Sequence, residues 1–528
     1  MSGISSVSFD ENSTIDYDNI KSPGIKNYIS KYYNYTIREL DGKKYIPKMW
    51  FRDQSFLNIK NADVDVSDLK YFTSLYSLEL NNTNITSIDD LPAFDLYSIN
   101  LSNNKLTNID KLSEYKKLGN INVSNNNIQD VGKLKDSAVH NLDISNNSNV
   151  SGYSEIKTLT ELNLSNNNIS ELENIDYDLI SLNISNNNLE SMPIISSLYS
   201  LDISDNKIKD LNGIENITYL SNLNISGNSI NNLSINKEGL MLEYSNVSID
   251  DVKTLNNLNV WGLELKNDSI KSLEGFVPGS NLKYIDLSNN AGLKGYGKLN
   301  IEQIKLINCG IEELEDFRDK VNSLDISNNN ISNIEKLSSS KNLTTLIINN
   351  NKSVISGNIS GDKLRWLYFD NSKIGKDSRF NFDNKVDVTI SDLGSYFNIN
   401  KTCDKCRYII NNQKLDEEFL ETTFDSTKEI YFSNMILEID AYKEGNVIKI
   451  KDIPMIDSNS LIALYATINE DGAVISRDRR KIILEKEDIK KISFSATVSR
   501  NDKIYYPNVI VNIKEKESLL DSIFNLFR

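Results

Sequence analysis

The sequence predicts an α/β solenoid in which short parallel strands line a concave face, followed by a small β-sandwich domain. Three observations predict the solenoid: an eleven-residue frame recurs along the chain, its copies follow one another at a steady interval, and an Asn stands at the ninth position of most copies. A chain of 528 residues is too long for one compact core, so a repeat array or several domains are expected from length alone.

The recurring frame reads LxxLxLxxNxL, as in residues 159–169 and 179–189. Its interval of about 20–22 residues is typical of leucine-rich repeats, which form a horseshoe. Copies begin at Leu75, Leu96, Leu118, Val139, Leu159, Leu179, Leu198, Leu220, Leu282, Val321, Leu343 and Leu364, with weaker copies near Gln54, Lys237, Val260 and Ile301. We therefore predict about sixteen repeats over residues 54–394, preceded by an N-terminal cap over residues 1–53.

Each position of the frame has a physical role. The two apolar residues of LxL are two apart, so both face one side of a short strand and point into the core. The Asn at position nine follows the strand, and its amide can pair buried backbone groups within its own repeat and toward the next. We expect this Asn to be structural, because an unpaired buried backbone group costs about 1–3 kcal/mol. Apolar residues three apart after the Asn, such as Ile208, Leu211 and Ile214, fit a 3₁₀ or irregular helical return on the convex side.

The charge balance excludes some partners. The formal net charge is −16, whereas a nucleic-acid binder needs a basic surface that displaces counterions. The run at 477–481 is short and is expected to be a solvated hairpin flank. No stretch of 18 apolar residues predicts a transmembrane segment, and the residues after Met1 do not resemble a signal peptide. A removed leader, another export route and export as part of a larger assembly all remain open.

The cysteines and the single histidine do not predict a metal site or a cofactor. Cys309 lies inside a repeat, where we expect a small buried hydrophobe. Cys403 and Cys406 form a CxxC, interpreted as a tight turn with two thiols or a local disulfide. A zinc site needs four ligands, and the one histidine, His140, is far away in sequence. His140 is expected to be a solvated or hydrogen-bonded surface residue.

The chain changes character near residue 395, where the Asn frame stops. Short alternating segments and a hairpin turn at 469–472 predict a β-sandwich over residues 395–514. An apolar tail follows over residues 515–528, with Leu519, Ile523, Phe524 and Phe527 at helical spacing. We expect this tail either to fold back on the sandwich or to dock into a partner or a larger assembly.

A ligand is expected on the concave face, where solenoids recognise their partners. Positions three, five and seven of the frame project there. In the first half of the array position five is mostly Asn or Asp and position seven is mostly Ser, whereas aromatic and apolar residues gather in the later half. The predicted ligand-binding residues are Tyr244, Tyr284, Ile307, Ile347, Trp366 and Tyr368. For Trp366 and Tyr368, coverage by the C-terminal module is an equally weighted alternative.

The frame LxxLxLSxNxIxxLxxI over residues 54–390 resembles the repeats of the bacterial internalin-type family. The segment Pro23–Tyr33 looks like the cap helix of that family, with Ile25, Tyr28, Ile29 and Tyr32 on one face suited to covering the first repeat. The resemblance implies a non-enzymatic protein that binds a protein receptor with its concave face, and an immunoglobulin-like module after the repeats. The chain departs from the family in showing no leader, no surface anchor and several short or degenerate repeats.

Two functions follow from these observations. The first is a non-catalytic bacterial adhesin or receptor-binding protein, outside the cell or on its surface, that binds a protein or a cell-surface glycoconjugate. The alternative is a receptor-binding, baseplate or fibre component of a phage tail or tail-like particle, docked through its C-terminal tail. An enzyme is the least favoured reading, because the residues after the repeats are β-rich and their only thiols are the CxxC pair.

Overall fold

The computed structural model describes residues 13–231, 233–361, 363–370, 372, 380–382 and 385–391, and beyond these the strands given below. The chain divides into two compact units. Unit 1 comprises Met1–Leu265 with Phe276–Leu282, and unit 2 comprises Lys266–Gly275 with Lys283–Arg528. Both units contain parallel strands that return at the interval predicted from the sequence.

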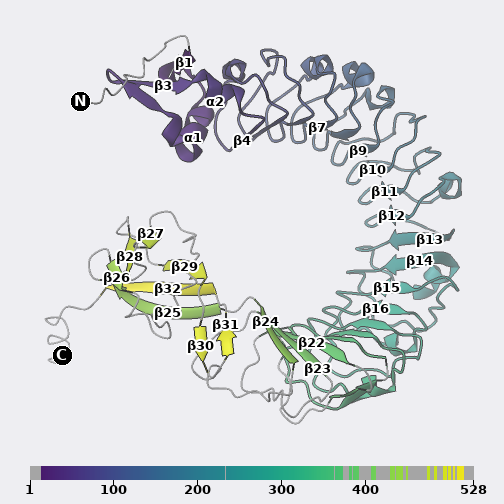
Figure 1. Ribbon diagram of the computed structural model, residues 1–528. Coiled ribbons are helices and arrows are strands. Elements are labelled where there is room, and N and C mark those ends of the chain that lie inside the picture. Colours follow the sequence, from purple (N-terminus) through teal and green to yellow (C-terminus); the bar gives the residue numbers. More distant parts are fainter. Residues whose placement is uncertain are drawn as a thin grey trace, which may run out of the picture. The chain divides into compact units, whose positions relative to one another are not determined.

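Unit 1 begins with a cap (Figure 1). Strands β1 (Thr14–Asp16) and β2 (Arg38–Leu40) pair antiparallel with β3 (Lys43–Pro47), and the short helix α2 (Lys48–Arg52) leads into the repeats. Helix α1 (Pro23–Tyr32) starts at Ser22, whose hydroxyl accepts a hydrogen bond from Ile25 N, and Pro23 occupies the first turn, where its missing N–H is tolerated.

One face of α1 covers the first repeat only in part. Ile25 and Ile29 are fully buried, whereas Tyr28 is half-buried and Tyr32 is 58% exposed. The expectation that all four side chains cover the first repeat is therefore wrong for Tyr32. The helix buries its two isoleucines and presents its tyrosines along an open side.

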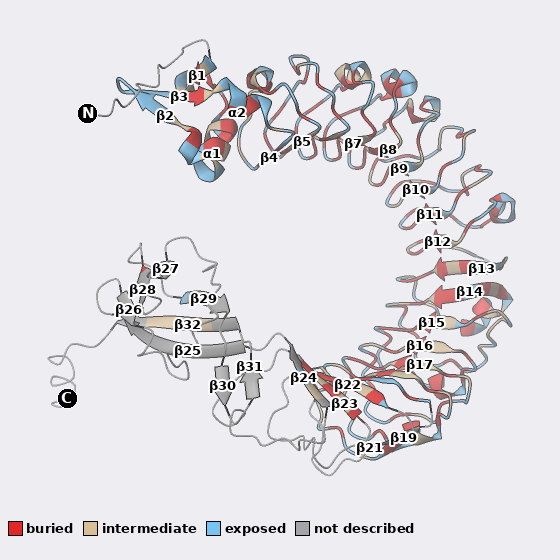
Figure 2. Ribbon diagram, viewed as in Figure 1, coloured by how far each residue is buried: buried red, intermediate tan, exposed pale blue. Residues whose placement is uncertain are grey.

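The repeats of unit 1 form a parallel ladder in which each strand pairs with the strand of the next repeat. Figure 1 shows these strands following one another along one edge of the unit. They are β4 (Phe56–Lys60), β5 (Ser77–Asn81), β6 (Ser98–Asn100), β7 (Asn120–Asn122), β8 (Asn141–Asp143), β9 (Glu161–Asn163), β10 (Ser181–Asn183), β11 (Ser200–Asp202), β12 (Asn222–Asn224), β13 (Ile235–Glu243) and β14 (Leu258–Glu264). The register aligns position four of successive frames, such as Leu142 with Leu162 and Leu162 with Leu182. These side chains are buried while both neighbours are half-exposed or exposed, and Figure 2 shows this alternation along the repeats.

Unit 2 contains a second run of the same ladder. Its strands are β15 (Tyr284–Asp286), β16 (Gln303–Lys305), β17 (Ser323–Asp325), β18 (Thr345–Ile347), β20 (Trp366–Tyr368), β22 (Val386–Ser391), β23 (Cys406–Asn411) and β24 (Glu429–Ser433). A short pair, β19 (Ile359–Gly361) and β21 (Phe380–Phe382), runs parallel beside it. β23 and β24 continue the parallel register of β22. The ladder thus extends past residue 394, where the sequence analysis ended it, because apolar residues keep the strand spacing there without the Asn frame.

The position-nine Asn residues join neighbouring repeats. Asn126 Nδ2 donates to the carbonyls of Leu101 and Val123, both at 3.0 Å, while its Oδ1 accepts from Leu106 N at 2.9 Å. The same pattern recurs at Asn187, Asn206, Asn228 and Asn329. The predicted structural Asn ladder is confirmed, but the amide reaches the preceding repeat rather than the next one.

Cys309 occupies position nine of its repeat and substitutes for the Asn. It is fully buried, and its thiol donates to Leu287 O at 3.3 Å, the carbonyl that an Asn amide would reach from this position. Burial raises the pKa of the Cys309 thiol to about 11, which keeps it protonated and able to donate. Cys309 is thus a hydrogen-bond donor as well as the small buried side chain that was predicted.

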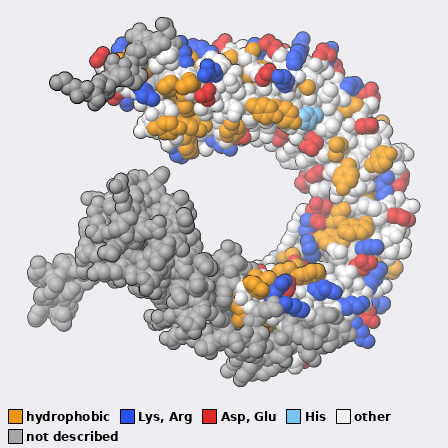
Figure 3. All heavy atoms as spheres, in the orientation of Figure 1, with side chains coloured by type: hydrophobic (Ala, Val, Ile, Leu, Met, Phe, Trp, Pro, Cys, Tyr) orange, Lys and Arg blue, Asp and Glu red, His pale blue; other side chains and the backbone are white. Residues whose placement is uncertain are grey.

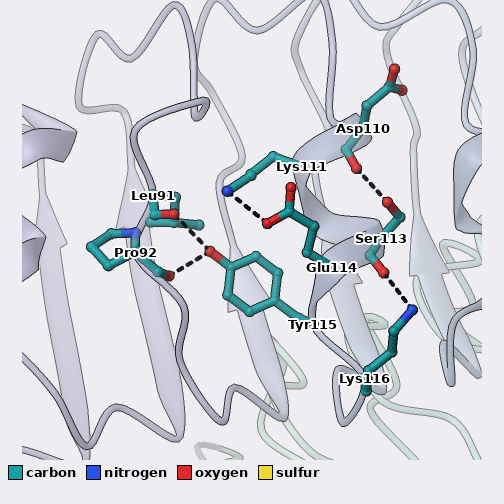
Figure 4. A network of polar contacts seen from close by, with 8 residues as sticks. All are labelled: Leu91, Pro92, Asp110, Lys111, Ser113, Glu114, Tyr115 and Lys116. Carbon is teal, nitrogen blue, oxygen red and sulfur yellow. Dashed lines mark hydrogen bonds and ion pairs between the residues drawn. The ribbon is translucent and has the colours of Figure 1, made fainter.

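Short 3₁₀ helices return the chain on the side opposite the strands, as the apolar spacing after the Asn predicted. They are η4 (Val66–Tyr71), η5 (Asp110–Glu114), η6 (Gly132–Asp136), η7 (Tyr153–Glu155), η8 (Ile214–Asn216), η9 (Val252–Asn257), η10 (Tyr296–Lys298) and η11 (Glu335–Ser339), and two further 3₁₀ turns lie in the cap, η2 (Tyr17–Asn19) and η3 (Asn34–Thr36). Figure 4 shows how η5 is tied to the preceding return: Tyr115 Oη donates to Pro92 O at 2.6 Å and lies 3.2 Å from Leu91 O. Lys111 pairs with Glu114 at 2.7 Å on the solvent side.

Several strands lie outside the parallel ladder at the C-terminal end, some of them at the alternating segments of the sequence. β25 (Ile436–Lys443) and β29 (Lys491–Ser495) flank β32 (Asn508–Glu515), parallel and antiparallel respectively. β26 (Val447–Lys449) and β27 (Ala473–Ile475) pair antiparallel with β28 (Lys481–Leu484), and β30 (Val498–Arg500) pairs with β31 (Lys503–Tyr505). The β-sandwich over 395–514 stays a prediction, and two strands within that range, β23 and β24, belong to the ladder instead.

Candidate ligand-binding surface

The concave side of unit 2 carries a row of apolar side chains at position five of the frame. The register places Ile347 beside Tyr368, Tyr368 beside Thr389, Thr389 beside Ile409 and Ile409 beside Tyr431. Parallel strands lie about 4.8 Å apart, so these side chains are neighbours. Thr389 is buried, Ile347, Tyr368 and Ile409 are half-exposed, and Tyr431 is 55% exposed. We call Ile347, Tyr368, Ile409 and Tyr431 the concave row.

Trp366 widens the concave row. It lies two residues before Tyr368 on β20, so both project from the same face, and it is 44% exposed. Trp and Tyr are the side chains that most often dominate protein interfaces, because they offer a large apolar area at little cost in conformational entropy. Ile409 and Tyr431 were not predicted, because both follow the end of the Asn frame and only the strand register brings them to this face.

Charged residues flank the concave row. Arg407 forms an ion pair with Asp387 on the neighbouring strand at position three. Lys305 Nζ lies 5.5 Å from the centre of the Tyr284 ring. Figure 3 shows hydrophobic and basic side chains together on this described part of unit 2. An apolar centre with charged neighbours is the usual composition of a protein-binding surface.

The other predicted site residues divide into two groups. Tyr284 and Ile307 are half-exposed at positions three and seven, on β15 and just after β16. Tyr244 is buried, which contradicts its assignment to the ligand surface. A register shift in β13 between Lys237 and Met241 places Glu243 at position five, so Tyr244 takes position six and points into the core.

Unit 1 carries a second exposed aromatic surface, which the sequence analysis missed. The rings of Tyr76 and Tyr97 stack with their centres 5.3 Å apart, and Tyr97 Oη lies 3.4 Å from His140 Nε2. Gly119 lies between Tyr97 and His140, and a Cβ there would lie 2.3 Å from the His140 ring. We call Tyr76, Tyr97 and His140 the aromatic strip, and Figure 3 shows the histidine at the end of a line of hydrophobic side chains.

A shared frame position in the sequence could have identified the aromatic strip. All three residues stand at position two of their frames, as do Ile180 and Tyr199, which are 55% and 53% exposed. Positions three, five and seven of this half of the array are polar, so the strip is visible only when position two is read as well. His140 is hydrogen-bonded at the surface, as expected.

Other predicted features lie partly or wholly outside the described residues. The tail residues Leu519, Ile523, Phe524 and Phe527 and the CxxC residue Cys403 belong there, while Cys406 is disulfide-bonded. Within the described part of the chain, no cluster of three metal-ligand side chains occurs. No helix among the described residues has the length and apolar character needed to cross a membrane.

The repeats of this chain are similar to those of known proteins. Residues 195–290 match the family model of the leucine-rich-repeat domain of the endo-β-N-acetylglucosaminidase EndoS. No curated protein matches the chain.

Several solved structures are similar to the chain. The functional domain of InlJ from Listeria monocytogenes shares 16% identity over 95% of this chain and 99% of that one, with a TM-score of 0.35. The internalin InlF from the same species shares 16% identity over 81% of this chain and 99% of that one, with a TM-score of 0.24. YopM from Yersinia enterocolitica shares 20% identity over 69% and 79%, with a TM-score of 0.34. The leucine-rich-repeat fold rests on the strand register and the Asn ladder of the chain itself.

Proposed function

We propose that the chain is a non-catalytic recognition protein that binds a protein ligand through the concave side of β15–β24. The observation that carries this proposal is the concave row with Trp366, a set of half-exposed and exposed apolar side chains on β18, β20, β23 and β24 of one parallel ladder. A ligand that covers these side chains removes apolar area from water, which stabilises a complex by about 25 cal/mol per Å² before the costs of association. The proposal places the protein outside the cell or at a bacterial surface, where internalin-type proteins act.

Trp366 and Tyr368 are expected to contribute most to the free energy of ligand binding. Trp366 and Tyr368 lie centrally, between Ile347 on one side and Ile409 on the other. Central aromatic residues contribute most of the binding free energy in protein interfaces, while charged residues at the edge contribute orientation and association rate. Arg407, Asp387 and Lys305 take that second role here.

The test is binding of the labelled protein to intact cells of candidate hosts, followed by cross-linking to identify the partner. The double variant Trp366→Ala/Tyr368→Ala should weaken binding to the identified partner by about thirtyfold, which corresponds to about 2 kcal/mol. The matched control is Ile180→Ala/Tyr199→Ala, which removes similarly exposed side chains from unit 1 and should bind as the wild type does. Equal loss in both double variants would contradict the placement of the site.

Enzymatic treatment of the cells distinguishes a protein ligand from a glycoconjugate ligand. Protease treatment should abolish binding, whereas glycosidase treatment should leave it intact. The opposite result would contradict a protein ligand. Failure to bind any cell, combined with assembly into particles that depends on residues 515–528, would favour the phage-tail alternative.

A further inference from the structure

A groove lies between helix α1 and strand β4 in unit 1, far in sequence from the concave row. It encloses about 770 Å³ and is lined by residues from α1, from β4 and from the turn that follows β4. This volume is within the range of sites that bind small ligands or a few residues of a peptide. We call it the cap groove.

The helix and the strand approach each other closely at one end of the cap groove. Gly24 N donates to Asp63 O at 2.8 Å, and a Cβ on Gly24 would lie 3.0 Å from both Asp63 O and Ile59 Cγ2. Gly24 therefore allows α1 to contact the end of β4. Toward its other end α1 contributes Tyr28, Lys31 and Tyr32, which line the groove.

Aromatic rings form the apolar part of the groove. The ring centres of Tyr28 and Tyr32 are 5.5 Å apart, and Phe56, at the start of β4, is 45% exposed. Burial, together with the neighbouring Tyr33, raises the pKa of Tyr28.

The backbone of β4 presents its outer edge to this side. In later repeats the position-five carbonyl points to the preceding strand: Leu101 N donates to Asn122 O at 2.8 Å, and Val123 N to Asp143 O at 2.9 Å. The register makes Asn58 the equivalent of these residues in β4. β4 is the first strand of the unit 1 ladder, so the Asn58 carbonyl points away from β5, toward the side where α1 and the cap groove lie. Such an edge is a template for another strand.

The charges of the cap groove are opposite to those of the chain as a whole. Its lining includes Lys31 and Lys60 and no Asp or Glu, in a chain with a net charge of −16. Lys31 Nζ lies 4.9 Å from the centre of the Tyr32 ring, and Lys60 Nζ lies 3.5 Å from a carboxylate oxygen of Glu79. A ligand carboxylate complements the ammonium group of Lys31 and can share that of Lys60 with Glu79.

We propose that the cap groove binds an extended acidic peptide segment of a partner protein, which adds as a strand beside β4. In this arrangement the peptide backbone pairs with the outer edge of β4, its carboxylates contact Lys31 and Lys60, and its apolar side chains lie against Tyr28, Tyr32 and Phe56. The strand edge favours a peptide over an anionic glycan, because a glycan has no regular row of amides to pair with it. This site is separate from the concave row and does not depend on the function proposed above.

The test measures fluorescence polarisation of a labelled hexapeptide, Glu-Val-Glu-Val-Glu-Val, with the full-length protein. It should bind more tightly than the matched peptide Lys-Val-Lys-Val-Lys-Val. Backbone N-methylation of the three Val residues and of the three Glu residues gives two further probes. Alternate residues of a strand point their N–H groups to opposite edges, so one of these probes should lose binding and the other should retain it.

Protein variants locate the site. Lys31→Glu/Lys60→Glu should weaken binding of the acidic peptide by about tenfold, and Tyr32→Ala should weaken it as well. The matched controls are Lys133→Glu/Lys135→Glu, which makes the same charge change at exposed residues of η6, and Tyr219→Ala, which removes a tyrosine that is 82% exposed. Unchanged unfolding midpoints establish that each variant is folded.

Three results would overturn the proposal. The first is that the acidic and basic peptides bind equally well, or that neither binds. The second is that both N-methylated probes bind as the parent peptide does. The third is that 3′-sialyllactose binds in place of the peptide, with the same dependence on Lys31 and Lys60. The last result would assign the groove to an anionic glycan.

Discussion

Asn125 and Asn126 are adjacent in sequence but have different physical roles. Asn125 is exposed and adopts a φ of 54°, a left-handed conformation that Asn and Gly tolerate better than other residues. Asn126 is buried and joins two repeats through its amide. Gly227 occupies the position of Asn125 in a later repeat, with a φ of 67°. The Asn-Asn pairs of the sequence thus combine a turn residue with a ladder residue.

The two roles predict different costs of substitution. Asn126→Ala should lower the free energy of unfolding by about 2–4 kcal/mol, because Leu106 N loses its acceptor in the core. The carbonyls of Leu101 and Val123 each lose one amide donor but keep a second, from Asn104 and Asn147. Asn125→Ala should cost about 1–2 kcal/mol through the strained φ, and Asn125→Gly should be close to neutral. Urea unfolding midpoints followed by circular dichroism check this order. An Asn126→Ala midpoint at or above that of Asn125→Ala would contradict the ladder role.

At the scale of elements, the cap is fixed to the ladder by a small set of polar contacts at the start of α1. Ser22 N donates to the buried Asp68 carboxylate at 2.6 Å, and Asp65 N donates to Ser22 Oγ at 3.3 Å. The same hydroxyl caps α1 through Ile25 N. One serine therefore connects the helix to the residues that follow β4.

The substitution Ser22→Ala should destabilise the cap by about 1 kcal/mol, the usual effect of removing a helix N-cap. The backbone contact of Ser22 N with Asp68 is kept, so the effect should be local to α1. Hydrogen exchange measured by mass spectrometry should show faster exchange in residues 22–33. Ser22→Thr, which retains the capping hydroxyl without adding a charge beside Asp68, should restore much of the protection; uniform acceleration over all repeats would argue against a local role.

At the scale of the whole molecule, each repeat contacts mainly its sequence neighbours. Backbone hydrogen bonds between repeats join residues about one repeat apart, such as Ile144 N with Asn163 O and Leu164 N with Asn183 O. Stability in such an array is close to a sum of repeat and neighbour contributions. Removing one complete repeat should therefore preserve the fold, whereas removing part of one should not.

A pair of deletions tests this modularity. Deletion of residues 163–182 joins Leu162 to Asn183 in the same frame, and should give a folded protein with a modestly lower unfolding midpoint. Deletion of residues 163–172 breaks the frame, and should expose apolar surface that circular dichroism and size-exclusion chromatography detect as lost structure and aggregation. Equal behaviour of the two deletions would contradict a modular array.

The sequence by itself determined the repeats, the direction of their apolar residues, the Asn ladder and the 3₁₀ returns. These features depend on residues close together within one repeated frame, so a periodic pattern is sufficient to predict them. It also placed Ile347, Trp366 and Tyr368 on the concave face, because those repeats keep the frame.

Only the tertiary structure decided where the strand register shifts and which side chains of different repeats contact one another. Tyr244 is in the core because β13 changes register, and Ile409 and Tyr431 reach the concave row because β23 and β24 pair with the ladder without an Asn frame. Tyr97 and His140 meet because Gly119 between them has no side chain, and the cap groove forms where α1 packs beside β4. Each of these depends on strand pairing or packing between residues about 20 or more positions apart, which a single repeat does not encode.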